Sequence, residues 1–302
     1  MQIEAIGFNR RESLEDYCSK NHMDLLLLPI EDRDFKSEAV AKTIILSADK
    51  MVSVTDVCIY KYQSMNTIVD EIISMIPYNN AERFLNVSGT KKRVLGVYSP
   101  IGRCFKTSFA LSLAKLYAVD NKVLYINLEE YSGLARFISR DFEHTLSDIM
   151  LMYMQEAGTI LLKQERMIRD IYNVSILPPL SCIRDIFEIS IEMWKGYFEL
   201  LVTGSVYEVI IIDFGTTSFF REELFELCDV IYVPGIKGTS AAVKLEEFAK
   251  YIEKIKDGKL KNRIVNIELP YIEELKTADS FAMVAMNLEF TKYVREIMQW
   301  KN

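Results

Sequence analysis

The sequence predicts an α/β protein in which a doubly wound, mostly parallel β-sheet follows a smaller α/β unit. Short apolar runs alternate with helix-like stretches along the 302 residues, and this alternation is typical of parallel strands joined by crossover helices. Half of the residues are hydrophobic, and there are only 12 glycines and 7 prolines, which excludes disordered and collagen-like classes. At roughly 150 residues per domain, the length predicts two domains.

A polar segment marks the boundary between the two predicted units. Residues 79–92 interrupt the apolar periodicity with Asn, Ser, Gly and Lys, as a connecting segment does. We therefore predict a first domain at 1–78, a linker at 79–92 and a second domain at 93–302.

The first domain is expected to be a small α/β unit. Its apolar runs predict strands at 3–8, 24–29, 42–46 and 57–60, and helix-like stretches lie at 12–19 and 67–76. Pro29, Ser47 and Lys61 stand at or directly after the ends of the last three strands.

This order of elements resembles a response-regulator receiver domain without its first strand and helix. The receiver family has an acceptor Asp, a Ser or Thr and a Lys at three strand ends. Pro29 stands here at the acceptor position, while Ser47 and Lys61 match. Because proline cannot be phosphorylated, the resemblance implies a degenerate receiver that takes no part in a phosphorelay. A generic α/β cap is the alternative interpretation.

The second domain is expected to carry the large sheet. Buried-strand runs lie at 93–98, 122–128, 174–178, 208–213, 230–234 and 263–269, and helices are predicted at 106–119, 143–170, 187–203, 239–256 and 280–299. In open sheets of this class, ligands bind beyond the carboxyl ends of the strands. Functional residues are therefore expected at the strand ends of this domain.

The first of these strands leads through a short loop to Lys106, Thr107 and an amphipathic helix. This context suits phosphate binding, because backbone amides at a helix N-terminus hold anionic oxygens, a lysine neutralises them and a hydroxyl binds Mg²⁺. The motif G-x-x-x-x-G-K-[ST] has glycine where Pro100 and Phe105 stand, and a bulky residue with positive φ costs about 1–3 kcal/mol. The candidate phosphate-binding residues are Gly102, Arg103, Cys104, Phe105, Lys106, Thr107 and Ser108.

Three later strands end in polar residues or in proline, and these residues are further candidates for the site. Asp213 follows four apolar residues, which is the Walker B pattern that holds a carboxylate near Mg²⁺. Asn127 and Glu129 stand at the end of the strand at 122–128, and Pro234 ends the strand at 230–234. All of these features occur in the order that a phosphate-binding α/β domain requires.

Together, the motifs resemble the MinD/ParA family of deviant-Walker P-loop ATPases across nearly all of residues 92–300. The resemblance makes Lys106, Glu129 and Asp213 the candidate catalytic residues, with Glu129 activating water. It also makes Thr107 and Asp213 the candidate Mg²⁺ ligands and brings Pro234 to the base-binding region. Ile101 stands where the family has its signature lysine, so a charged contact across a dimer would have to come from another residue, such as Arg103.

A receiver-like domain ahead of a MinD-like domain narrows the resemblance to the TadZ/CpaE branch, whose members help to localise pilus or secretion machinery. The resemblance implies a cytoplasmic homodimer that binds ATP or ADP with Mg²⁺, hydrolyses ATP slowly and has pilus or secretion proteins as partners. Two alternatives stay open. One is a nucleotide-free scaffold, favoured by Pro29, Ile101 and Phe105. The other is a metabolic P-loop ligase or phosphotransferase, which would need a second polar pocket.

Charge and cysteine content exclude several other classes. The net charge of −7 at pH 7 gives no overall attraction to nucleic acid or anionic lipid, and no nucleic-acid partner is expected. No apolar run reaches the about 20 residues that span a bilayer.

The five scattered cysteines are typical of a reducing cytoplasm. Apolar residues 290, 293, 294 and 297 recur at helical spacing and predict a C-terminal helix packed on the sheet, so that any membrane contact would be indirect.

Overall fold

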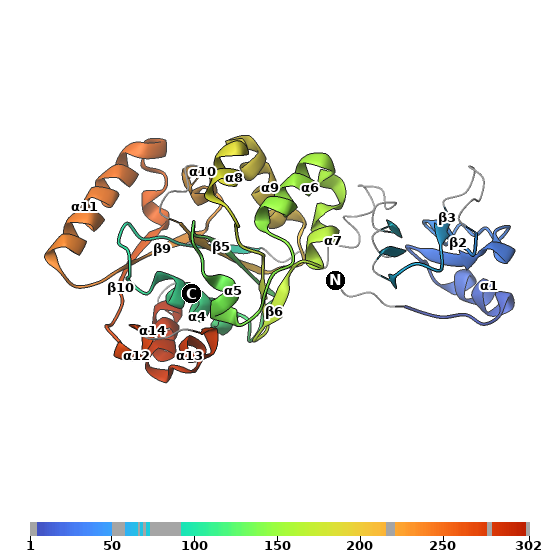
Figure 1. The fold of residues 1–302 in the computed structure, drawn as a ribbon, viewed down its shortest axis with the longest axis horizontal. Coiled ribbons are helices and arrows are strands. Elements are labelled where there is room, and N and C mark those ends of the chain that lie inside the picture. The colour runs from blue at the N-terminus through green and yellow to red at the C-terminus, as the bar shows by residue number, and fades with distance from the viewer. Residues whose placement is uncertain are drawn as a thin grey trace. The chain divides into compact units, whose positions relative to one another are not determined.

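The computed structural model describes residues 5–49, 58–65, 67–68, 71–72, 92–215, 221–276 and 280–299 (Figure 1). The chain divides into two units, Met1–Phe84 and Leu85–Asn302, each with a sheet of its own. This division falls inside the segment 79–92 that the sequence predicts as a linker, of which the described residues include only Lys92.

The first unit contains a parallel sheet of three strands in the order β1-β2-β3. In chain order it consists of α1 (Arg11–Lys20), β1 (Leu26–Pro29), the 3-10 turn η1 (Ile30–Asp32), β2 (Thr43–Ser47) and β3 (Cys58–Tyr60). Leu14 and Cys18 of α1 pack on Leu26, Leu28 and Ile45 of the sheet. Leu26 and Leu28 share a face because successive residues of a strand point to opposite sides.

The prediction of a strand at 3–8 is wrong for residues 5–8, which are the part of it that the structure describes. Residues 5–8 form no strand, and the ring of Phe8 lies 5.3 Å, between centroids, from that of Tyr17 on α1. Because Phe8 packs on the core beneath α1, the segment lies against the helix and not in the sheet. The helix expected at 67–76 falls mostly outside the described residues, of which 67–68 and 71–72 are helical.

The second unit contains a seven-stranded sheet in the order β10-β9-β4-β8-β5-β7-β6. Neighbouring strands are parallel except for the antiparallel pair β6 and β7. The strands are β4 (Arg93–Val97), β5 (Val123–Leu128), β6 (Arg169–Ile171), β7 (Val174–Ile176), β8 (Val209–Phe214), β9 (Val230–Gly235) and β10 (Ile264–Glu268). The predicted α/β class with a mostly parallel sheet is confirmed.

Helices cover both faces of this sheet (Figure 1). One face carries α4 (Lys106–Tyr117), α5 (Leu134–Ile138), α12 (Glu273–Lys276), α13 (Phe281–Met286) and α14 (Leu288–Gln299). The other carries α6 (Leu146–Gln155), α7 (Ile160–Glu165), α8 (Ile183–Glu188), α9 (Ile191–Gly204), α10 (Arg221–Phe225) and α11 (Thr239–Lys254). The 3-10 turns are η2 (Ala157–Thr159), η3 (Ile255–Gly258) and η4 (Lys261–Arg263). Because both faces are covered, every residue of β5 and β8 is buried.

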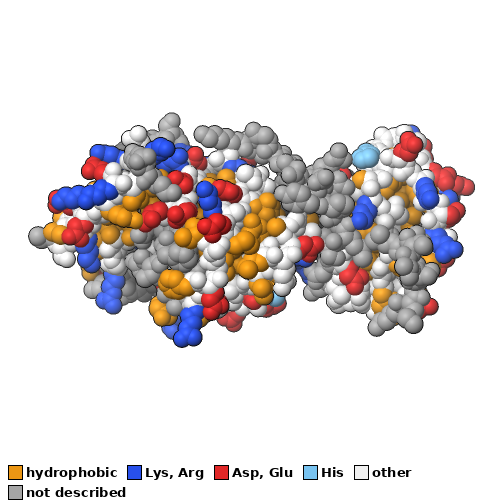
Figure 2. Space-filling model, turned by 90° about the horizontal axis from the view of Figure 1, so that it is seen from above, with side chains coloured by type: hydrophobic (Ala, Val, Ile, Leu, Met, Phe, Trp, Pro, Cys, Tyr) orange, Lys and Arg blue, Asp and Glu red, His pale blue; other side chains and the backbone are white. Residues whose placement is uncertain are grey.

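The face formed by α6 and α8 to α11 presents both charge signs to solvent. Figure 2 shows Lys and Arg side chains interspersed with Asp and Glu, and hydrophobic side chains gathered between them. Leu151 and Met154 of α6 are among the exposed hydrophobic side chains. On α11, Lys250 pairs with Glu246 at 2.6 Å. Mixed charges of this kind produce no strong field of one sign.

Three predicted helices are interrupted in the structure. The stretch 143–170 divides into α6, η2 and α7 and ends in β6, because the backbone leaves the helical region at Glu156 (φ −153°, ψ 77°). The stretch 187–203 divides into α8 and α9, and the Ser190 side chain caps the start of α9. The stretch 280–299 breaks at Asn287, between α13 and α14. The sequence does not predict β6, α10 or α12, which are too short to show a periodic pattern.

The C-terminal amphipathic stretch packs within the protein. Phe290, Val294 and Ile297 of α14 are buried in the same apolar core as α4, which lies between α14 and the sheet. The helix therefore covers α4 with the apolar face that the sequence pattern predicts. No helix within the described part of the chain is both long and apolar enough to span a membrane.

Candidate phosphate-binding site

Three parallel strands bring their carboxyl ends together at the centre of the larger sheet. The register pairs Asp213 of β8 with Val97 of β4 on one side and with Asn127 of β5 on the other. From β4 the chain continues to β5 on one side of the sheet and later reaches β9 on the other. This edge is therefore a topological switch point, where open α/β sheets bind their ligands.

The loop between β4 and α4 holds two bulky residues in the left-handed region. Arg103 has φ 57°, and Phe105 has φ 58° and ψ 25°. Phe105 is the N-cap of α4, and its carbonyl accepts a hydrogen bond from the Phe109 amide at 2.8 Å. A non-glycine residue in this region costs about 1–3 kcal/mol, so contacts elsewhere in the loop must hold the conformation.

The first half of the loop is fixed to β9 and α11. The Ser99 hydroxyl donates to the Pro234 carbonyl at 2.6 Å and accepts from the Ile101 amide at 3.1 Å. Ile101 and Cys104 are buried in an apolar cluster with Ala241 of α11. Ile101 therefore packs within this chain, with 8% of its surface exposed.

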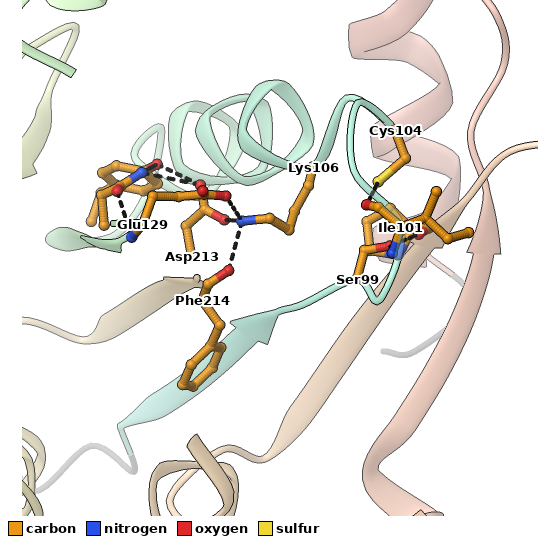
Figure 3. Close-up of polar contacts among 10 residues, drawn as sticks. Ser99, Ile101, Cys104, Lys106, Glu129, Asp213 and Phe214 are labelled. Carbon is orange, nitrogen blue, oxygen red and sulfur yellow. Dashed lines mark hydrogen bonds and ion pairs between the residues drawn. The ribbon is translucent and has the colours of Figure 1, made fainter. Parts of the chain in front are cut away.

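Lys106, the first residue of α4, is turned toward the ends of β5 and β8 (Figure 3). Its ammonium forms an ion pair with Asp213, a second with Glu129 at 2.5 Å, and a hydrogen bond to the Phe214 carbonyl at 2.7 Å. Oxygens of three residues therefore surround the Lys106 ammonium, two of them as hydrogen-bond acceptors and one as an ion-pair partner.

Asp213 is fully buried, and both of its oxygens have partners. Lys106 bonds Oδ1, and the Tyr125 hydroxyl donates to Oδ2 at 2.9 Å. The Asn127 amide lies 3.3 Å from the same Oδ2 and 3.0 Å from the Tyr125 hydroxyl. Buried charges persist only when they are paired and hydrogen-bonded in this way.

Burial and charge act on the Lys106 ammonium in opposite directions. Burial lowers its pKa, but the carboxylates of Asp213 and Glu129 together outweigh that effect and raise the pKa above the ordinary 10.5. Lys106 is therefore charged at neutral pH. Burial, and then the Asp213 charge, raise the pKa of Tyr125 well above its ordinary value, so its hydroxyl keeps the proton that it donates.

Gly215 follows β8 where the ends of β5 and β8 approach closely. A Cβ atom at this position would lie 2.4 Å from the Leu128 carbonyl oxygen and 2.9 Å from Oε1 of Glu130. A backbone oxygen cannot move aside as the end of a side chain can. Glycine therefore keeps the Phe214 carbonyl, one residue earlier, within reach of Lys106.

The structure brings the three candidate catalytic residues into one cluster and leaves the other candidates along the loop. The cluster contains Lys106, Glu129 and Asp213. Of the others, Gly102 and Arg103 are exposed, Cys104 is buried, and Phe105, Thr107 and Ser108 are half-buried. The Pro234 carbonyl contacts Ser99, at the other end of the loop from Lys106.

The aromatic residues Tyr125 and Tyr271 carried no recognised signal in the sequence. Tyr125 lies two residues before Asn127 on β5, so strand alternation could have placed both side chains on the face that meets Asp213. The ring of Phe105 packs on the core and, edge-on, against Tyr271 after β10, with centroids 6.4 Å apart. No sequence pattern pairs positions 105 and 271.

The residue types of the cluster and of the adjoining Thr107 fit a phosphate group together with Mg²⁺. An ammonium suits phosphate oxygens, and the hydroxyl of Thr107 and the carboxylate of Asp213 are the hard oxygen ligands that Mg²⁺ prefers. Among the described residues, no group of three or more His, Cys, Asp or Glu is placed to hold a metal ion, so a cation here also needs oxygens from water or nucleotide. Phe105 fits less well, because glycine at its position lets backbone approach phosphate closely.

Known structures share the fold of this chain. It is similar to a ParA family ATPase from Chlorobium tepidum TLS, with a TM-score of 0.57 and 18% identity, over 71% of this chain and 100% of that one. It also matches a plasmid partition protein from Borrelia burgdorferi (TM-score 0.47, 16% identity, 70% and 100% of the two chains). A third match is the MinC:MinD cell division protein complex of Aquifex aeolicus (TM-score 0.47, 15% identity, 68% and 78%).

No protein-family model and no curated protein sequence matches the chain. At 18% identity, the first structural similarity establishes the arrangement of strands and helices. The chain therefore has the fold of a ParA family ATPase.

Proposed function

We propose that this chain is an ATP-binding switch protein of the ParA/MinD kind, which dimerises and hydrolyses ATP slowly. The observation that supports this most is the meeting of Lys106, Glu129 and Asp213 at the switch point of the sheet. Buried ion pairs add little to stability, because desolvation offsets their attraction. A buried charge cluster at a ligand-binding edge therefore favours a functional role.

Each charged residue has a part in this proposal. Lys106 neutralises phosphate oxygens, and backbone amides at the start of α4 supply further donors to them. Thr107 and Asp213 hold Mg²⁺, which supplies positive charge beside the phosphates. Glu129, whose side chain is 27% exposed, reaches solvent and orients the attacking water.

We propose that nucleotide occupancy drives dimerisation. Ile101 is buried beside α11 and offers no charge to a second copy. Arg103 is exposed on the same loop and is our candidate for that contact. Light scattering tests this: ATP with Mg²⁺ should double the mass of the parent, and Arg103→Ala should weaken the effect. An unchanged response of Arg103→Ala would remove Arg103 from the proposal.

Binding of a fluorescent ATP analogue with Mg²⁺ tests the nucleotide site. Lys106→Ala should bind at least about tenfold more weakly than the parent, since it loses a charge-assisted contact. Lys106→Arg keeps the buried charge, so it separates loss of phosphate contact from loss of folding. Lys115→Ala is the matched control, because Lys115 lies on the same helix but bonds the Ala285 carbonyl. Equal binding by the parent and by folded Lys106→Ala would contradict the proposal.

A nucleotide-free scaffold is the second candidate function. Two observations favour it: Phe105 occupies a left-handed position that favours glycine, and the Lys106 ammonium is paired with Asp213, Glu129 and the Phe214 carbonyl. The scaffold would dimerise without nucleotide, and neither its melting temperature nor its mass would respond to ATP. An ATP-dependent rise in melting temperature would exclude it.

We further propose that the switch serves a pilus or secretion assembly, as TadZ/CpaE proteins do. A small α/β unit precedes the unit with the seven-stranded sheet, and this order supports the assignment. Deletion of the gene should abolish surface pili or secretion, and the parent gene, but not Lys106→Ala, should restore it. Normal assembly in the deletion strain would contradict this role.

We propose that the first unit is a degenerate receiver. Pro29 ends β1, buried Ser47 ends β2, and the Lys61 ammonium lies 5.1 Å from the centre of the Tyr62 ring. Incubation with acetyl phosphate and Mg²⁺ should leave the mass of the intact chain unchanged, because no aspartate stands at the acceptor position. Stable addition of one phosphoryl group within 1–78 would contradict the proposal.

A further inference from the structure

We propose that Glu129 makes this site selective for nucleotide that carries Mg²⁺, because it helps to hold Lys106 away from phosphate until a divalent cation engages the carboxylates. The inference rests on the proposed nucleotide-binding function. It assigns to Glu129 a positioning role that precedes any part in hydrolysis.

The contacts of Lys106 are the first support. Its ammonium donates hydrogen bonds to Asp213 and to the Phe214 carbonyl at 2.7 Å, and it forms an ion pair with Glu129 at 2.5 Å (Figure 3). A phosphate oxygen can bond this ammonium only by displacing one of these acceptors. Nucleotide binding is therefore a competition for Lys106, and it is decided by how readily each acceptor is given up.

The charge of the cluster is the second support. One ammonium faces two carboxylates, so Lys106, Glu129 and Asp213 together carry one negative charge. The side chain of Asp213 is 0% exposed and that of Lys106 is 9% exposed, so solvent screens these charges weakly. Free nucleotide is a polyanion and meets repulsion here, whereas bound Mg²⁺ brings two positive charges and prefers carboxylate ligands.

The surroundings of the two carboxylates identify Glu129 as the contact that controls access. Asp213 keeps the Tyr125 and Asn127 hydrogen bonds if Lys106 leaves, so it remains satisfied in the interior. Glu129 has a side chain that is 27% exposed, and water can replace Lys106 as its partner. Removal of the Glu129 charge leaves one ammonium facing one carboxylate, and the excess negative charge disappears.

The backbone holds Glu129 in position for this role. Its amide donates to the side-chain oxygen of Asn127 at 3.0 Å, and the end of β5 lies directly against Gly215. Asn127 therefore contacts both the Glu129 backbone and the Asp213 carboxylate. The backbone of Glu129 is thus held directly after β5, next to the end of β8 that carries Asp213.

Calorimetric titration of the intact chain with ATP, once with excess Mg²⁺ and once with EDTA, tests the proposal. The parent should bind ATP more tightly with Mg²⁺, and Glu129→Gln should reduce that preference about tenfold, mainly through tighter binding in EDTA. Glu130→Gln is the matched control, since it removes the same charge one residue away and should keep the parent's preference. Glu129→Asp keeps the charge and should stay closer to the parent than Glu129→Gln.

Each outcome distinguishes this inference from the function on which it rests. An unchanged preference in Glu129→Gln, or an equal loss in Glu130→Gln, overturns the role of Glu129 and leaves nucleotide binding intact. Absence of ATP binding by the folded parent in both conditions overturns the proposed function together with the inference. Circular dichroism establishes that each variant is folded, and Glu129→Ala, which also removes the charge, takes the place of Glu129→Gln if that variant does not fold.

Discussion

The two carboxylates that face Lys106 differ in burial, and stability should reveal the difference. Asp213→Asn leaves Lys106 buried with less counter-charge and should lower the free energy of unfolding by about 3–5 kcal/mol. Glu129→Gln affects a partly exposed side chain and should cost about 1 kcal/mol. Urea denaturation followed by circular dichroism measures both values. Equal losses would mean that the model of one buried and one accessible carboxylate is wrong.

At Gly215, a single methyl group should disturb the site. Gly215→Ala puts a Cβ atom 2.4 Å from the Leu128 carbonyl, and relief of that overlap should cost about 1–3 kcal/mol of stability. Gly102→Ala is the control, because nothing lies within 4 Å of a Cβ there, and its cost should stay within about 0.5 kcal/mol. Thermal melts compare the two variants. Similar melting temperatures would show that the two strand ends are not held as closely as described.

Ionisation of the Tyr232 hydroxyl should lower the free energy of unfolding at high pH. This hydroxyl is buried without a hydrogen-bond partner among the described residues, and burial raises its pKa from 10.0 to about 12. The folded state favours the protonated phenol, so this stabilisation is complete below pH 10 and is lost as pH rises toward 12. The loss should reach about 3 kcal/mol, and Tyr232→Phe should abolish it. Denaturation at pH 8 and above pH 10 measures the difference, and an identical pH dependence in both proteins would contradict the assignment.

Among the elements, the loop between β4 and α4 is joined to α11 by apolar packing at Ile101. Ile101→Lys should destabilise the protein by about 3 kcal/mol, because it buries an unpaired ammonium. Ile101→Val removes one methylene and should cost about 1 kcal/mol. If Ile101→Lys proved as stable as the parent in urea, the loop could release residue 101 to solvent, as a contact across a dimer requires.

Long elements could be predicted from the sequence because their residue patterns repeat. The buried runs that became β5, β8 and β9 have apolar residues on both faces, and α4 and α11 begin after clear loop signals. The stretch at 143–170 was harder, since its apolar periodicity continues although the backbone turns at Glu156. Short elements such as β6 and α12 depend on contacts distant in sequence and carry no pattern of their own.

Within the site, the sequence could predict residue types at strand ends but not how they pair. Asp213 and Lys106 follow recognisable patterns, whereas their direct contact depends on how β8 and α4 are placed by the whole sheet. The burial of Ile101 depends on α11, which lies about 140 residues further along the chain. Contacts of this kind exist only after the sheet has assembled.

The whole molecule combines the fold of a ParA family ATPase with a buried cluster of Lys106, Glu129 and Asp213 at the switch point of the sheet. In the proposed function, phosphate binding requires Lys106 to exchange its carboxylate partners for phosphate oxygens, so bound nucleotide would alter the charge at the ends of β5 and β8. The same loop contacts β9 and α11 through Ser99 and Ile101. The loop between β4 and α4 therefore links the Lys106 cluster to β9 and α11.

The most direct test of nucleotide binding is calorimetric titration of ATP with Mg²⁺ into the intact parent, with Phe105→Gly alongside it. We predict saturable binding by the parent with a Kd in the micromolar range, about −8 kcal/mol, and tighter binding by Phe105→Gly, because glycine adopts the left-handed backbone at residue 105 without strain. No heat of binding from the folded parent, with binding recovered only in Phe105→Gly, would contradict the switch function and make the nucleotide-free scaffold the account to adopt.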